Sequence, residues 1–467
     1  MVRLTFLALA LCLGVYAAAL IVDAVALDRH LLRDSLIIAL MAATIFALWA
    51  PSRDDTGAAP PIGRRAVELL IAVTALAALL RLWRLGALPP ECIDAECQRA
   101  LLVAEGNPSA NLVVRLAALV FTVTGEGLLS QRLAGALLGA LTVPVLYLAA
   151  RHWALHAGAL LGALLLAASP WHIGASRSGD PAVALPLLVC IGLWAMMGAL
   201  VSSSRLRWQY GGGLLVVLLL LVNEGWTQPW PAPYEGALAI VSALLHASAQ
   251  PVGLPLLTPL VGSLAFMGIG FSVRHATRWR YAGLLAASML LAIGGLRLTP
   301  GGGATLWLLA VPFFLFATLA LDRLFGQFRQ TWRVLWRPAY LFTAALAMVA
   351  IIGLRDATAF LNRLDTLTTA GLTPAHVAIS RHLAGALQQL AAPTPIYVVP
   401  AAVVSSDATR LLAGSAWRSD AVIPLEASAA ALPAIAIHGP PEHELRVLIP
   451  ADELPWLQLW RQLFPGS

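Results

Sequence analysis

The chain has 467 residues, of which 59% are hydrophobic and 12% are charged, and its mean hydropathy is +0.80. These values exclude an ordinary soluble globular protein. The formal net charge of +6 arises from basic residues that are all arginine. In so apolar a chain this charge indicates loops that meet anionic lipid, and it does not indicate binding to nucleic acid.

Long apolar stretches recur along the first three quarters of the chain. Windows of roughly 17–20 almost uncharged residues are long enough to cross a hydrocarbon layer of about 30 Å. They predict eleven membrane spans, at about 3–22, 35–50, 66–84, 130–150, 154–170, 182–201, 209–226, 254–273, 281–298, 304–321 and 338–354. The first is interpreted as an uncleaved helix because ten further spans follow it. Residues 234–247 are apolar but short, so they are interpreted as an interfacial or re-entrant helix.

The arginines predict the orientation of these spans. Arginine is enriched in the short cytoplasmic loops of membrane proteins. With a cytoplasmic N-terminus, the arginine-rich loops near 53–65, 151, 205–207, 274–280 and 323–337 all fall on the cytoplasmic side. The loop 85–129, the turn 169–181 and everything after about 355 then lie outside.

The C-terminal stretch 355–467 has a different pattern. Short β-like runs at 394–400, 434–439 and 445–450 are bounded by proline and glycine. Before and after them, 374–390 and 452–464 show helical periodicity. The sequence therefore predicts a polytopic α-helical membrane domain, 1–354, with about eleven transmembrane helices, and a small extracytoplasmic α/β domain, 355–467.

The predicted outer loop contains an unusual group of acids. The run "ALPPECIDAECQRALLVAEG" (87–106) places Asp94 and Glu96 beside apolar segments. Asp94 is either a functional carboxylate or the N-cap of a helix over 95–105 that Gly106 ends, and the two roles are compatible. Cys92 and Cys97 flank the pair, either as a disulfide or as two thiols.

The order of these motifs resembles the GT-C glycosyltransferases, in particular protein O-mannosyltransferases, lipid A aminoarabinose transferases and their bacterial relatives. The matching features are "LPPECIDAECQRALLVAEG", the arginine-led helix "QRLAGALLGALTVPVLYLAARHW" (131–153), the turn "SPWHIGASRSG" (169–179), "ALDRL" (320–324) and a small C-terminal outer domain. The resemblance is close over about 66–200 and looser over 254–467. The chain departs from it in Asp94-Ala95-Glu96, where the family has adjacent acids, and in a shortened segment 223–253.

The resemblance implies an enzyme of the plasma (inner) membrane that moves a sugar from a polyprenyl-phosphate donor to an acceptor outside the cytoplasm. Asp94 or Glu96 would take the acceptor proton. Cations would stabilise the departing lipid phosphate. The predicted substrate-binding residues are Arg99, Arg132, His172, Arg177 and Glu224, with Arg115 as a further cation. We expect no cofactor and no metal site; the partners are membrane lipid, the lipid-linked sugar and an acceptor that the sequence does not identify.

Each of these residues also has a purely structural interpretation. Arg132 begins a span and could extend its charge to the interface. His172 and Arg177 stand at a span end, where interfacial anchors are common, and Glu224 could be wetted. Two other functions remain open: a lipid or solute transporter, against which the absence of an internal sequence repeat counts, and a non-catalytic partner subunit.

Overall fold

The computed structural model describes most of the helical region and part of the rest of the chain. The described residues are 6–16, 29–50, 62–85, 99–101, 103, 112–125, 127–201, 209–216, 258–298, 303–331, several positions within 346–358, Leu383 and three short strands. The chain divides into two compact units. The first comprises Met1–Leu85, Ala110–Val113 and Leu133–Arg363; the second comprises Gly86–Ser109, Val114–Arg132 and Leu364–Ser467.

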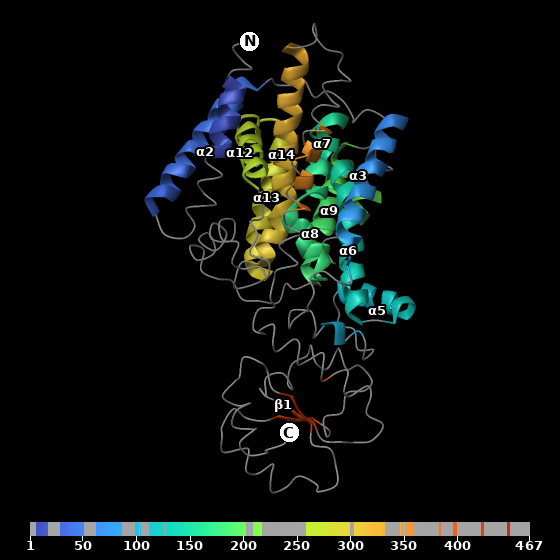
Figure 1. Ribbon diagram of the computed structural model, residues 1–467. Coiled ribbons are helices and arrows are strands. Elements are labelled where there is room, and N and C mark those ends of the chain that lie inside the picture. Colours follow the sequence, from blue (N-terminus) through green and yellow to red (C-terminus); the bar gives the residue numbers. More distant parts are fainter. Residues whose placement is uncertain are drawn as a thin grey trace, which may run out of the picture. The chain divides into compact units, whose positions relative to one another are not determined.

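The first unit is a bundle of helices (Figure 1). Its helices are α2 (Arg29–Trp49), α3 (Arg64–Leu82), most of α6 (Gly127–Ala150), α7 (His156–Ala167), α8 (Pro170–Arg177), α9 (Ala184–Val201), α12 (Pro259–Arg274), α13 (Trp279–Leu298) and α14 (Gly303–Thr331), with a 3₁₀ turn at Pro181–Val183. Helix α5 (Leu112–Thr124) belongs almost wholly to the second unit.

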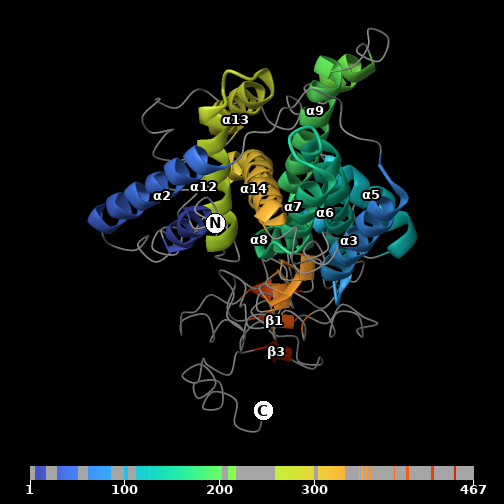
Figure 2. The same cartoon turned by 90° about the horizontal axis from the view of Figure 1, so that it is seen from above.

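Helix α14 is the centre of the first unit. It packs against α12, α13, α7 and α9, and Figure 2 shows it between α12 and α7. Two glycines bring its neighbours close: a Cβ on Gly162 of α7 would overlap Thr318, and one on Gly268 of α12 would overlap the backbone of Phe316. Small residues at such crossings are the usual means of close helix packing in membranes.

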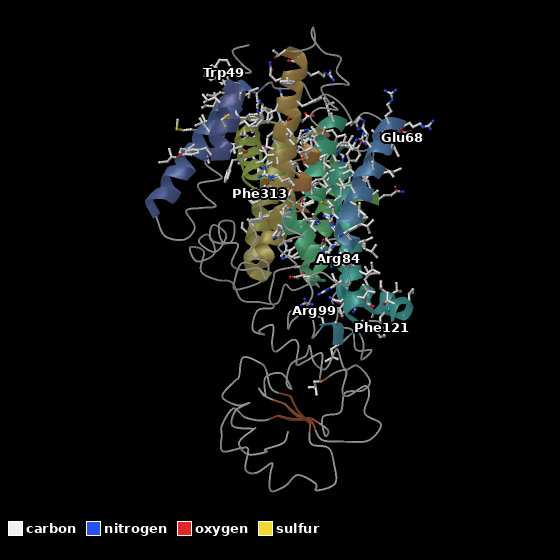
Figure 3. All side chains as sticks on the ribbon, viewed as in Figure 1. Trp49, Glu68, Arg84, Arg99, Phe121 and Phe313 are labelled. Atoms are coloured by element: carbon white, nitrogen blue, oxygen red, sulfur yellow. The ribbon has the colours of Figure 1, made fainter. Side chains whose placement is uncertain are left out.

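Different loops lie at the two ends of this bundle. At one end Trp153 Nε1 donates to the carbonyl of Arg280 at 3.0 Å, Leu155 N donates to Asp322 Oδ1 at 2.9 Å and Arg323 Nη2 donates to the Tyr281 hydroxyl at 2.8 Å. Figure 3 shows Trp49 and Glu68 at one end of the bundle and Arg84 at the other. Loops predicted to share a membrane face therefore meet in the structure, while the assignment of that face to the cytoplasm stays a prediction.

The prediction of a mostly helical chain with several apolar helices is confirmed. Within the described residues, 128–150, 184–201 and 307–331 are long and apolar enough to cross a membrane, and the bent pair α7 and α8 would make a fourth span. Shorter apolar helices occupy 6–16, 37–49, 112–124, 260–274 and 279–293. The predicted spans 209–226 and 338–354 are described only in part, and the predicted interfacial or re-entrant helix 234–247 lies outside the described residues, so the count of eleven stays a prediction.

The described part of the C-terminal stretch is a three-stranded parallel sheet. Its strands are β1 (Ile396–Val398), β2 (Val422–Pro424) and β3 (Arg446–Leu448), in the order β2-β1-β3. Tyr397 pairs with Ile423 on one side and with Val447 on the other. β1 and β3 fall inside two predicted β-like runs, whereas β2 was not predicted. The third run, 434–439, and the predicted helices 374–390 and 452–464 lie outside the described residues, apart from Leu383, which is helical.

Candidate functional site

The predicted outer turn 169–181 begins with a short helix set at an angle to the helix before it. Helix α7 ends at Ala167, α8 starts at Pro170, and their axes differ by 53°. Ser169 is the N-cap of α8, its hydroxyl accepting from His172 N at 3.4 Å, and Pro170 follows at the first helical position. Both residue types are favoured there, because serine accepts an N–H that has no partner in the helix and proline has none to offer.

The bend leaves carbonyl groups at the end of α7, and Arg81 of α3 satisfies them. Its Nη1 donates to Ala167 O at 3.1 Å, and its Nη2 lies 3.5 Å from Leu166 O. Nη1 also donates to Ala77 O, within α3 itself, at 2.9 Å. A cation is favourable there, because a helix C-terminus carries a partial negative charge. Arg81 is fully buried, and it makes no ion pair with any residue that the structure describes.

Arg177 of α8 donates to carbonyls at the end of α3, as Arg81 donates to those at the end of α7. Its Nη1 donates to the carbonyls of Arg81 at 2.9 Å and Trp83 at 2.8 Å, and lies 3.4 Å from that of Leu80; its Nη2 donates to Arg84 O at 3.3 Å. The planar guanidinium is suited to such a set, because its N–H groups point in several fixed directions. Arg177 thus ties α8 to α3, and its predicted contact with a donor phosphate stays a prediction.

Two glycines of α6 allow α8 to lie close to it. A Cβ on Gly139 would come within 2.5 Å of Ser176 Cβ, and one on Gly135 within 2.6 Å of Ser176 O. The Ser176 hydroxyl donates back to the carbonyls of His172 at 2.6 Å and Ile173 at 3.0 Å. The result is a tightly packed short helix that holds the backbone of His172 in place.

His172 and Trp171 carry buried donors. The His172 Nδ1 lies 2.6 Å from Arg81 Nη2, and the side chain is 0% exposed. Trp171 is 1% exposed, and its ring lies 4.7 Å from that of Trp307 on α14. Among the described residues, neither His172 Nε2 nor Trp171 Nε1 has a hydrogen-bond partner. An indole N–H cannot accept, so this region supplies donors and a positive charge.

The structure places the predicted site residues unevenly. His172 and Arg177 come together on α8. Arg132 lies in α6 at 1% exposure and Arg99 in a short helical stretch, both in the second unit. Asp94, Glu96 and Glu224 lie outside the described residues, as do Cys92 and Cys97. No group of three or more potential metal ligands occurs in the described part of the chain.

The sequence patterns do not single out Arg81. A signal is present, since Arg81 is a charged residue in the last turn of an apolar helix, and such residues are functional candidates by default. The same position also suits an ordinary arginine that extends to the membrane interface. Its partners on α7 and α8 lie 85 to 91 positions further along the chain, so only the folded bundle reveals them.

Comparison with known proteins identifies one family in the middle of the chain. Residues 110–224 match the family model described as dolichyl-phosphate-mannose-protein mannosyltransferase. This range contains α5 to α9, including the whole of α8. The predicted resemblance to protein O-mannosyltransferases is therefore confirmed over this part of the chain. No curated protein matches.

Two solved structures are distantly similar. One is the archaeal oligosaccharyltransferase AglB from Archaeoglobus fulgidus, solved with an inhibitory peptide and a dolichol-phosphate; it is 11% identical with a TM-score of 0.47, over 75% of this chain and 64% of that one. The other is ArnT from Cupriavidus metallidurans bound to undecaprenyl phosphate, 14% identical with a TM-score of 0.42, over 85% and 90% of the two chains. This chain thus spans less than two thirds of AglB. At these scores neither likeness establishes a shared fold.

Proposed function

We propose that this chain, similar to dolichyl-phosphate-mannose-protein mannosyltransferases over residues 110–224, is a membrane glycosyltransferase. It would move a sugar from a polyprenyl-phosphate donor to an acceptor at the extracytoplasmic face. The observation that carries this proposal is that the matched range contains α8, whose Trp171 and His172 carry buried N–H groups. The buried Arg81 of α3, outside the matched range, contacts His172 and makes this donor-rich region cationic.

The chemistry requires two kinds of group. An acceptor hydroxyl becomes a stronger nucleophile when a carboxylate within hydrogen-bond reach takes its proton, which typically contributes about 10²–10⁴-fold to the rate. The departing lipid phosphate gains negative charge as the sugar–oxygen bond breaks, and cations or fixed N–H donors stabilise it. Asp94 is the proposed base and Glu96 the second candidate, since Asp94 follows "PP" and precedes the predicted helix.

A direct displacement accounts for the reaction with these groups alone. The acceptor oxygen attacks the anomeric carbon, its proton passes to Asp94, and the sugar–phosphate bond breaks with its electrons going to the lipid phosphate. No covalent intermediate with the protein is needed, and the sugar configuration inverts. The released polyprenyl phosphate remains anionic, which is why basic side chains belong at the donor end of such a site.

The test is transfer from radiolabelled polyprenyl-phosphate sugars by the purified protein in lipid nanodiscs supplied with membrane extract. We expect label to move into a lipid, glycan or protein fraction. Asp94→Asn keeps a good N-cap and removes the base, so transfer should fall ~10²–10⁴-fold. Glu68→Gln is the matched control, because Glu68 is an exposed acid at the other end of α3 paired with Arg64.

The opposing outcomes are distinct. Wild-type rates in both Asp94→Asn and Glu96→Gln would remove the acidic loop from the chemistry. Movement of intact labelled lipid between leaflets, without any sugar transfer, would favour a transporter. Absence of transfer with every donor tested, together with binding to another membrane glycosyltransferase, would favour a partner subunit.

A further inference from the structure

His172 has a defined protonation form in this structure. Arginine carries only N–H donors, so the 2.6 Å contact between Arg81 Nη2 and His172 Nδ1 requires Nδ1 to accept. A doubly protonated imidazolium has no acceptor nitrogen. His172 is therefore neutral, and its single ring proton lies on Nε2. Ring nitrogens of histidine are commonly set in this way by the hydrogen bond at the opposite nitrogen.

That arrangement leaves a buried donor. His172 Nε2 has no hydrogen-bond partner within the described part of the chain, and the side chain is 0% exposed. Buried donors without partners are rare in folded proteins and call for an explanation. Trp171 Nε1, on the preceding residue, is likewise a buried donor with no hydrogen-bond partner among the described residues.

The charge balance indicates what kind of group would satisfy such donors. Arg81 is buried and makes no ion pair with the residues described; among those residues its charge faces only neutral acceptors, namely backbone carbonyls and His172 Nδ1. Buried charges are usually paired. An anion that only accepts hydrogen bonds, such as a phosphate, would complement both the charge of Arg81 and the N–H of His172.

We infer that Arg81 is a positioning residue that holds His172 in the Nε2–H form, so that this N–H donates to a phosphate oxygen of the lipid-linked donor. The inference rests on the proposed function for the identity of the lipid phosphate. Arg81 acts through His172: it selects the tautomer, restrains the ring, and adds a positive charge to the region.

The first experiment measures the tautomer and the ligand contact without any transfer reaction. The whole protein is labelled with ¹⁵N-histidine, reconstituted in nanodiscs, and the His172 resonances are assigned with His172→Gln. We expect a protonated Nε2 and an unprotonated Nδ1. Undecaprenyl phosphate should shift the Nε2 resonance, whereas undecaprenol, which has the same tail without phosphate, should not.

Several results would overturn the inference. A proton on Nδ1 would remove the role of Arg81. If saturating undecaprenyl phosphate does not shift the Nε2 resonance, His172 does not contact the lipid phosphate. A shift with inorganic phosphate but none with undecaprenyl phosphate would assign the region to a soluble anion in place of a lipid.

The second experiment uses variants and separates this inference from the proposed function. Arg81→Gln should give a mixture of His172 tautomers, whereas Arg84→Gln, which alters an exposed side chain three positions away, should resemble the wild type. His172→Phe retains a ring of similar size and lacks Nε2, so undecaprenyl phosphate should bind ~10- to 100-fold more weakly. Unchanged affinity in folded His172→Phe would reject the inference and leave the Asp94 test untouched. If Arg81→Gln does not fold, the wild-type spectrum and His172→Phe still decide.

Discussion

Arg177 shows how one side chain can hold a helix end inside a bundle. It is fully buried, and its two terminal nitrogens donate to carbonyls at the end of α3. Those carbonyls have no partners within their own helix. Hydrogen bonds from a charged donor each contribute about 1.5–3 kcal/mol, more than neutral ones. The residue is therefore a strong contributor to stability, whatever it does for a ligand.

We expect Arg177→Lys to destabilise the protein by about 2–4 kcal/mol, since a lysine keeps the charge but cannot reach the carbonyls on both sides of the fork. Thermal unfolding in detergent, monitored by tryptophan fluorescence, would measure this against Arg84→Gln. Equal midpoints for the two variants would contradict the capping role. Affinity of the folded Arg177→Lys protein for undecaprenyl phosphate tests the predicted phosphate contact separately.

His152 gives a prediction about pH. Burial lowers the pKa of His152 from 6.5 to about 4, and the nearby charges of Arg280 and Arg151 act in the same direction. The unfolded chain therefore takes up a proton below pH 6.5 that the folded chain refuses until about pH 4, and stability falls as the pH drops through this window. At pH 5 the loss relative to pH 7.5 should be about 1–2 kcal/mol.

The measurement is the unfolding midpoint of the wild type and His152→Asn at pH 7.5 and pH 5. The wild type should lose more stability than the variant. Some acid sensitivity should remain, because burial and the charges of Arg274, Arg278 and Arg323 also lower the pKa of His275. An identical pH dependence in the two proteins would show that His152 is not protected from protonation.

At the scale of single residues, His172 and Arg177 of α8 were predictable from sequence, whereas Arg81 of α3, which contacts His172, was not. His172 and Arg177 are visible because they stand together in a polar turn after an apolar span. Arg81 looks like an ordinary arginine at a helix end, and its importance comes from a contact 91 positions away. Burial and hydrogen-bond partners depend on which helices pack together, which local sequence does not encode.

At the scale of elements, packing at α14 gives a sharp prediction. Gly268→Ala should destabilise the protein by about 1–3 kcal/mol, because the new methyl group would overlap the backbone of Phe316 and the backbone cannot turn away. Gly283→Ala is the matched control in α13, where the added methyl group would meet no atom within 4 Å. That change should stabilise the helix by about 0.5–1 kcal/mol.

Opposite signs in denaturant unfolding would confirm that α12 and α14 meet at Gly268. Destabilisation of the same size in both variants would instead point to a general effect of losing glycine. Equal stabilisation would mean that the two helices do not approach as closely as the structure shows.

Elements were predictable where a local pattern decides them. The apolar windows found α3, α6, α9, α12, α13 and α14, because length and hydropathy are enough for such helices. The turn 169–181 contains α8, whose start Ser169-Pro170 marks. Strand β2 was missed because the apolar run before Pro424 is only three residues long, shorter than the runs 394–400 and 445–450 that contain β1 and β3.

At the scale of the whole molecule, the topology is open to a direct test. A reporter that is active only in the cytoplasm should give a signal when fused after residue 152 and none when fused after residue 354, because the arginine-rich loops predict these sides. Two hydrogen bonds at one end of the bundle, Trp153 to Arg280 and Leu155 to Asp322, agree with this alternation. A strong signal after residue 354 would overturn both the span count and an outer active site.

The paired arginine caps also have a consequence for how the chain is made. Arg177 is synthesised 94 residues after Trp83, which at ribosomal rates is a delay of about 5–20 s. Until then the carbonyls at the end of α3 need water or the insertion machinery, because hydrocarbon offers them no donor. Nascent chains halted before residue 177 should therefore keep Trp83 within crosslinking reach of that machinery, and longer chains should release it.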